Sequence, residues 1–173
     1  MNDDKAVSPF VKRVIKAYHV QHDFAQDKCL DAPSGSGRNT FFLAQYFREV
    51  LAVDIDESAL HMIAQSGEVT NVRLQTVDLK APLDVEIASF KFVCIVHFFN
   101  VTFLRSLLKA MHTGAFLLIE TPACHGENFR TLPTDGEIKE LFRETELLVY
   151  DFKRCKHSAN NEDRGAVKAF LKI

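Results

Sequence analysis

Three acidic residues follow apolar runs of the sequence, and a loop with two glycines follows the first of them. Asp31 and Asp54 close the first two runs, and Asp78 comes just after the third. Gly35 and Gly37 let a ligand approach the main chain, because a Cβ at these positions would block it. A loop entering a helix also presents free backbone N–H groups at the positive end of the helix dipole. A carboxylate placed like Asp54 can accept both hydroxyls of a ribose. These residues predict a ligand-binding edge.

Alternating apolar runs and amphipathic segments must position these residues. Alternation of this kind predicts a parallel sheet with helices on both faces. Polar residues 158–165 separate the last two runs with no helix between them, so those runs are expected to form an antiparallel hairpin. The predicted strands are residues 28–31, 50–54, 72–75, 92–96, 115–119, 147–150 and 167–171. The predicted helices are residues 9–18, a segment carrying Phe41 to Phe47, residues 57–64, residues 103–111, and a segment opening at the capping box Thr134–Glu137. The expected fold is α/β, with three layers and a mostly parallel seven-stranded sheet.

The composition suits one domain spanning residues 1–173. The chain has 173 residues, of which 47% are hydrophobic, and a formal net charge of −2. No basic tract could neutralise successive phosphates, and no apolar run has membrane-spanning length, so neither nucleic acid nor a membrane is expected as a partner. Small-molecule chemistry is favoured.

The cysteines and the N-terminal residues indicate a reducing, cytoplasmic environment. Residues 1–5 are polar and acidic, unlike a secretory signal. The four cysteines lie far apart without a CxxC pair, which favours reduced thiols over disulfides or a zinc site. No metal is expected.

The run from Leu30 to Asn39 resembles the first motif of the class I S-adenosylmethionine-dependent methyltransferases, in which a strand-terminal acid precedes a glycine-rich turn. The resemblance extends from about Asp27 to the C-terminus in element order as well. It looks closest to the small tellurite-resistance-like and thiol-methyltransferase-like branch, which often carries a Gly-Arg-Asn similar to residues 37–39. The resemblance implies a Rossmann-like methyltransferase fold and methyl transfer from S-adenosylmethionine, with S-adenosylhomocysteine as product.

The resemblance also implies roles for individual residues. The loop glycines would line the methionine part of the cofactor, and Asp31 would help place its ammonium group. Asp54 would hold the ribose, Ile55 would pack on the adenine, and Asp78 would accept from the adenine amino group. The other cofactor contacts expected are Pro33, Ser34, Gly35, Gly37, Asn39, Leu79 and Val96.

Two residues depart from the family pattern. Pro33 replaces the usual first glycine, which fixes φ and removes a donor, so the loop geometry should differ without loss of binding. Lys91 replaces an acid common at the start of the fourth strand, at a position that is usually structural. Both leave open a non-catalytic binding or interaction module on the same fold.

Two further alternatives concern the glycine loop. It could be a tight strand-to-helix turn without a ligand. It could also bind a nicotinamide dinucleotide, because Gly35, Gly37 and Asp54 echo that fingerprint. Against the second alternative, Thr40 stands where the third glycine would be, and the chain lacks a second, substrate-holding domain.

Acceptor-facing groups are expected on the loops after the fourth and fifth strands. His97 is the candidate general base, since imidazole titrates near neutral pH, and the alternative is a hydrogen bond that orients a loop or the cofactor. Phe98 would line the pocket, and Asn100 is expected to cap the following helix. Residues 120–129 are expected to form a polar rim in which Cys124 and His125 contact substrate without binding a metal.

The N-terminal segment, residues 1–24, is expected to fold over the cofactor as a lid, as in similar methyltransferases. Tyr18 or Phe24 would then shield the sulfonium through a cation–π attraction, and the alternative is ordinary packing of an amphipathic helix. The expected partner is a small-molecule methyl acceptor, and the protein is expected to act as a monomer or homodimer.

Overall fold

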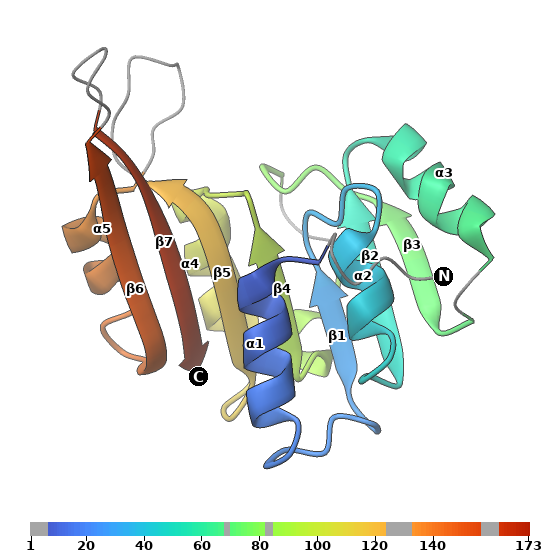
Figure 1. Ribbon diagram of the computed structural model, residues 1–173. Coiled ribbons are helices and arrows are strands. Elements are labelled where there is room, and N and C mark those ends of the chain that lie inside the picture. The colour runs from blue at the N-terminus through green and yellow to red at the C-terminus, as the bar shows by residue number, and fades with distance from the viewer. Residues whose placement is uncertain (1–6, 68–69, 82–84, 124–132, 157–162) are drawn as a thin grey trace.

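A computed structural model of the chain describes residues 7–67, 70–81, 85–123, 133–156 and 163–173. Within them, a seven-stranded sheet has the order β3-β2-β1-β4-β5-β7-β6. Figure 1 shows the sheet as a twisted central layer, with α1 and α2 on one face and α4 and α5 on the other. The predicted three-layer α/β fold with a mostly parallel sheet is confirmed.

The first five strands are parallel, and their carboxyl ends therefore meet at one edge. Asp31 pairs with Ala52 on one side and with Cys94 on the other, while Val96 pairs with Glu120. This register brings the ends of β1, β2, β4 and β5 together. The parallel strands are β1 (Lys28–Asp31), β2 (Glu49–Asp54), β3 (Val72–Thr76), β4 (Phe92–Val96) and β5 (Phe116–Ala123).

The C-terminal hairpin is confirmed, and it is longer than predicted. β6 (Glu146–Lys156) pairs antiparallel with β7 (Asp163–Lys172), and β7 inserts between β6 and β5. β5 also runs on to Ala123, so residues 120–123 are strand and not the predicted loop. Beyond Glu120, β5 pairs only with β7, and Pro122, which has no N–H to donate, lies in this one-sided stretch.

Side-chain caps explain where the helices begin. Ser8 caps α1 (Pro9–Tyr18), Asp56 caps α3 (Glu57–Ser66), and Asn100 caps α4 (Val101–Ala110). The capping box predicted at Thr134 opens α5 (Asp135–Leu141). α2 (Arg38–Leu43) is shorter than predicted, because the chain leaves the helix in tight turns before Tyr46 and Phe47.

The two faces of the sheet bury different cores. On the α4 and α5 face, aliphatic side chains dominate, and a short 3-10 helix, η1 (Ile87–Ser89), contributes Ile87 to them. On the α1 and α2 face, aromatic rings gather at the amino ends of the strands. We call this group the aromatic cluster, and it consists of Phe24, Phe47, Phe92, Phe116 and Phe170. No helix in the described part of the chain is long and apolar enough to cross a membrane.

Candidate cofactor and acceptor site

The loop that leaves β1 is tied to the end of β2 by backbone hydrogen bonds. The Ser34 amide donates to the Val53 carbonyl at 2.8 Å, and the Gly35 amide donates to Oδ2 of Asp54 at 2.7 Å. The Ala32–Pro33 peptide bond is cis, and Pro33 is half-buried. The loop predicted from the glycines therefore lies against the predicted acid.

Asp54, at the end of β2, accepts hydrogen bonds with both of its carboxylate oxygens. Its side chain is 8% exposed, and its second oxygen accepts from the Asp56 amide at 3.0 Å. Each carboxylate oxygen retains a lone pair for another donor. Next to it, Ile55 leaves 64% of its surface exposed, which is unusual for a large apolar side chain beside a buried strand.

Asp78 and Leu79 follow β3 on the other side of Asp54. Asp78 is exposed, and its Oδ1 accepts from the Lys80 amide at 2.9 Å within a tight turn. The Val77 amide donates to the Asp54 carbonyl, so this turn is attached to the end of β2. Leu79 points inward and is buried. The structure thus brings together the acids predicted at the ends of the second and third strands.

Asp31 is fully buried at the end of β1. Its Oδ2 accepts a hydrogen bond from the Thr40 hydroxyl at 2.7 Å, whereas its Oδ1 has no hydrogen-bond partner among the described residues. Burial raises the pKa of this carboxyl to about 7, although the bond from Thr40, the Cys94 thiol and the charge of Arg38 oppose the shift. Because Asp31 is fully buried where the loop leaves β1, Oδ1 has no contact with solvent.

The two loop glycines serve different purposes. Gly35 has φ of 52°, and a Cβ there would find no atom within 4 Å. Gly37 has φ of 90° at the start of α2, and a Cβ there would lie 2.7 Å from Cγ1 of Ile63. Gly37 thus serves helix packing, whereas the space above Gly35 is open.

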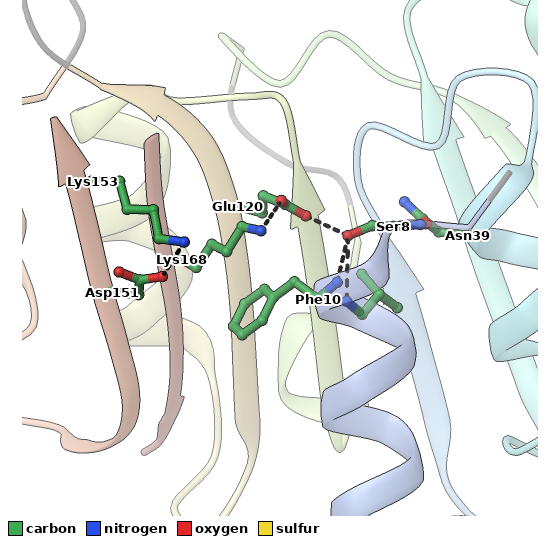
Figure 2. Close-up of polar contacts among 8 residues, drawn as sticks. Ser8, Phe10, Asn39, Glu120, Asp151, Lys153 and Lys168 are labelled. Carbon is green, nitrogen blue, oxygen red and sulfur yellow. Dashed lines mark hydrogen bonds and ion pairs between the residues drawn. The ribbon is translucent and has the colours of Figure 1, made fainter. Parts of the chain in front are cut away.

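A polar network connects the start of α1 to this edge (Figure 2). The Ser8 amide donates to Oδ1 of Asn39 at 3.0 Å, and the Ser8 hydroxyl donates to Oε2 of Glu120. Lys168 on β7 lies 3.1 Å from the other oxygen of Glu120, whose side chain is 15% exposed. Asn39, predicted as a cofactor contact, therefore accepts a hydrogen bond from the cap residue of α1 through its side-chain oxygen. Local sequence patterns do not indicate that Ser8, Glu120 and Lys168 are linked, because these positions lie far apart in the sequence.

The residues that follow β4 border the same edge. Val96 is buried, whereas His97 is exposed with φ of 62°, and its amide donates to the Glu120 carbonyl at 2.7 Å. A positive φ is uncommon outside glycine, so His97 stands at a constrained turn. Phe98 is half-buried and meets Phe103 edge to face at 5.6 Å. The predicted helix cap by Asn100 is confirmed.

Tyr18 and Phe24 are not brought to this edge. α1 runs opposite to the parallel strands, so Ser8 lies at their carboxyl ends and Tyr18 at the other end of the helix (Figure 1). Tyr18 packs on Phe170 at 4.7 Å, and Phe24 is buried in the aromatic cluster. The lid contribution expected from these two side chains is therefore replaced by the packing alternative. Cys124 and His125 lie outside the described residues.

A family model described as a methyltransferase domain matches residues 29–114, about half of the chain. The sheet of this chain, with β7 inserted antiparallel between β5 and β6, differs from the order 3-2-1-4-5-6 that is typical of nicotinamide-binding folds. The chain thus belongs to the class I S-adenosylmethionine-dependent methyltransferases. The enzymes of this family are methyltransferases whose cofactor is S-adenosylmethionine.

Solved structures share the fold at low sequence identity. TehB from Haemophilus influenzae aligns with a TM-score of 0.71 at 18% identity, over 93% of this chain and 61% of TehB. This chain thus spans less than two thirds of TehB. NodS from Bradyrhizobium japonicum, an N-methyltransferase in complex with S-adenosylhomocysteine, aligns with a TM-score of 0.66 at 14% identity, over 95% of this chain and 88% of NodS.

A third solved structure with this fold is the [4+2]-cyclase SpnF. It aligns with a TM-score of 0.67 at 12% identity, over 92% of this chain and 80% of SpnF. A search of curated proteins found no match to the sequence.

Proposed function

We propose that this enzyme transfers the methyl group of S-adenosylmethionine to a small-molecule acceptor by in-line displacement at the carboxyl edge of β1, β2 and β4. The observation that carries the proposal is the hydrogen bond from the Gly35 amide to Asp54, at a position where a Cβ on Gly35 would meet no other atom within 4 Å. A net charge of −2 gives little attraction for nucleic acid, which favours a small acceptor. The proposed setting is the cytoplasm, with the enzyme as a monomer or homodimer.

The described residues fit this cofactor in charge and in the hydrogen-bond acceptors that they offer. Free lone pairs on Asp54 suit the two ribose hydroxyls, and exposed Ile55 offers an apolar surface for adenine. The unpartnered Oδ1 of Asp31 provides negative charge for the ammonium group, and a Cβ at Gly35 would occupy the space that the methionine part needs. In this proposal Asp78 accepts from the adenine amino group. The neighbouring contacts are Pro33, Ser34, Gly37, Asn39, Leu79 and Val96.

The chemistry that the cofactor supplies is a methyl group on a positively charged sulfur. The protein then has to align the acceptor and exclude water, and these tasks need no covalent catalyst. In the proposal Phe98 shapes the acceptor side, and exposed His97 accepts a proton from acceptors that carry one.

Calorimetric titration with S-adenosylmethionine and S-adenosylhomocysteine tests the cofactor site. We expect both to bind the wild-type protein. Asp54→Asn should weaken binding by on the order of tenfold to a hundredfold, because hydrogen bonds to a charged acceptor are lost. Asp56→Asn is the matched control: it removes a carboxylate two residues away while keeping a good helix cap, and should bind as the wild type does. Equal affinity in the two variants would refute the ribose role of Asp54.

Turnover needs a separate test, because SpnF shows that this fold also occurs in a cyclase. A panel of thiols, amines, hydroxyl compounds and chalcogen oxyanions would be screened for release of S-adenosylhomocysteine. Release with any acceptor supports methyl transfer. Tight cofactor binding without release from any member of the panel would favour a module that retains the cofactor site alone, an alternative that Pro33 keeps open.

A further inference from the structure

Thr40 lies in the first turns of α2 and reaches back to the end of β1. Its hydroxyl donates to Oδ2 of Asp31 at 2.7 Å, and both side chains are fully buried. This bond occupies one carboxylate oxygen and leaves Oδ1 without a partner among the described residues. A buried carboxylate with one unsatisfied oxygen is costly in a fold, and such groups are enriched at functional sites.

We propose that Thr40 is a positioning residue for cofactor binding, whose hydroxyl holds the Asp31 carboxylate ionised and oriented beneath the loop that receives the methionine end of S-adenosylmethionine. The inference rests on the proposed function, in which Asp31 supplies negative charge for the ammonium group. A hydroxyl that donates to a carboxylate favours its charged form, whereas burial favours the neutral acid. Loss of the Thr40 hydroxyl would therefore lower the negative charge that Asp31 carries at neutral pH.

Among the groups around Asp31, Thr40 favours the ionised carboxylate most strongly, and the Cys94 thiol acts in the same direction. Cys29 on β1 and Cys94 on β4 are buried, and burial raises the pKa of each thiol well above its usual range, so both remain neutral. Arg38 on α2 favours the ionised form of Asp31, and Asp54 on β2 opposes it. Around neutrality, the proton on Asp31 is therefore the one that changes the charge of this group.

The consequence is a proton-linked affinity for ligands that carry the ammonium group. With its pKa raised to about 7, the Asp31 carboxyl must lose its proton before it attracts an ammonium ion. The affinity for ligands with the ammonium group should therefore rise as the pH increases through about 7. Replacing the Thr40 hydroxyl by a methyl group should raise the pKa further and move this rise to higher pH.

The experiment compares two ligands over about pH 5.5 to 8. S-Adenosylhomocysteine carries the amino-acid end, whereas 5′-methylthioadenosine has the same adenosine without it. Each is titrated calorimetrically into the wild type, Thr40→Val and Thr40→Ser. Thr145→Val is the matched control, since it also removes a hydroxyl hydrogen bond, to the Phe142 carbonyl. Deprotonation of the ligand amine affects all proteins equally, because it belongs to the ligand.

We expect Thr40→Val to move the rise of S-adenosylhomocysteine affinity upward by about one pH unit, which lowers affinity about tenfold at pH 6.5. Binding of 5′-methylthioadenosine should be unchanged, and Thr40→Ser should behave as the wild type. Equal weakening of both ligands at every pH would indicate a structural role and overturn the inference. If Thr40→Val does not fold, Thr40→Ala, which also lacks the hydroxyl, replaces it with the same expected shift. Asp31→Asn must then abolish the pH dependence, because it removes the group that titrates.

The proposed function fails separately from this inference. Wild-type protein that binds neither ligand at any pH refutes the cofactor site itself. If the wild-type protein binds S-adenosylhomocysteine with an affinity that does not depend on pH, the cofactor site stands and the proposed role of Thr40 is refuted.

Discussion

The two edges of the sheet are built in opposite ways. At the amino ends of the strands, the aromatic cluster fills the space with rings whose centroids lie 4.9 to 6.0 Å apart, as for Phe24 with Phe47 and with Phe116. At the carboxyl ends, the chain buries Asp31 and Asp54 and exposes Ile55. Lys91, one of the two departures from the family pattern, lies at the amino edge with its Nζ over the Phe116 ring.

This difference between the two edges indicates that the amino edge serves the stability of the fold and the carboxyl edge serves ligand binding. Close-packed rings stabilise the fold through buried area and aromatic contacts. Buried carboxylates stabilise it little or oppose it, and they persist where a ligand uses them. We therefore expect substitutions at the amino edge to change the free energy of unfolding and substitutions at the carboxyl edge to change ligand affinity.

The largest loss of stability is expected for Phe116→Ala. The ring is fully buried among other aromatic rings, so its removal should cost about 3 to 5 kcal/mol of unfolding free energy, measured by urea denaturation. Phe98→Ala, at a half-buried ring of the carboxyl edge, is the comparison and should cost clearly less. Equal losses would mean that the two edges do not differ in packing.

Asp31→Asn should separate stability from binding most sharply. Burial raises the pKa of Asp31 to about 7, well above that of an exposed carboxyl. The folded state therefore keeps the Asp31 proton to a higher pH than the unfolded state does. Wild-type stability should then fall as pH rises from about 4 to about 7, by about 1.4 kcal/mol for each unit of pKa difference.

The asparagine variant lacks this slope. It should therefore gain stability relative to the wild type above about pH 7 while losing affinity for S-adenosylhomocysteine. Urea denaturation and calorimetry at several pH values measure both. Parallel stability curves for the two proteins would contradict the assignment of the raised pKa to Asp31.

Much of the fold could be predicted because it depends on local patterns. Apolar runs marked all seven strands, and cap residues such as Asn100 and Thr134 marked helix starts. The strand-end acids were found because parallel strands bring their carboxyl ends together. The full length of β5 was missed, since its last residues depend on pairing with β7, more than forty residues further along.

The contacts that the sequence did not indicate are long-range or lie on the far side of a turn. Thr40 was noted only as a missing glycine, although its hydroxyl holds Asp31. Tyr18 was expected near the cofactor because the direction of α1 relative to the sheet cannot be read from its amphipathic pattern. That direction places Ser8 at the carboxyl edge instead.

The loop glycines should respond differently to alanine. Gly37→Ala places a Cβ at φ of 90° and 2.7 Å from Ile63, which should cost about 2 kcal/mol of stability. Gly35→Ala, at φ of 52° and facing open space, should cost about 1 kcal/mol. We expect Gly35→Ala to be the variant that weakens S-adenosylhomocysteine binding more, once both proteins are measured folded. The opposite order in affinity would place the ligand away from Gly35.

Ser8→Ala tests whether the network of Figure 2 does more than begin a helix. Loss of an N-cap alone should cost about 1 kcal/mol, and Asn100→Ala measures that loss at α4, where the cap bond stays within the helix. The Ser8 hydroxyl also donates to Glu120, so removing it takes a donor from a mostly buried carboxylate. We therefore expect Ser8→Ala to exceed Asn100→Ala by about 1 kcal/mol in urea denaturation. Equal costs would mean that Lys168 alone satisfies Glu120 and that α1 is held to the carboxyl edge by the Ser8 amide.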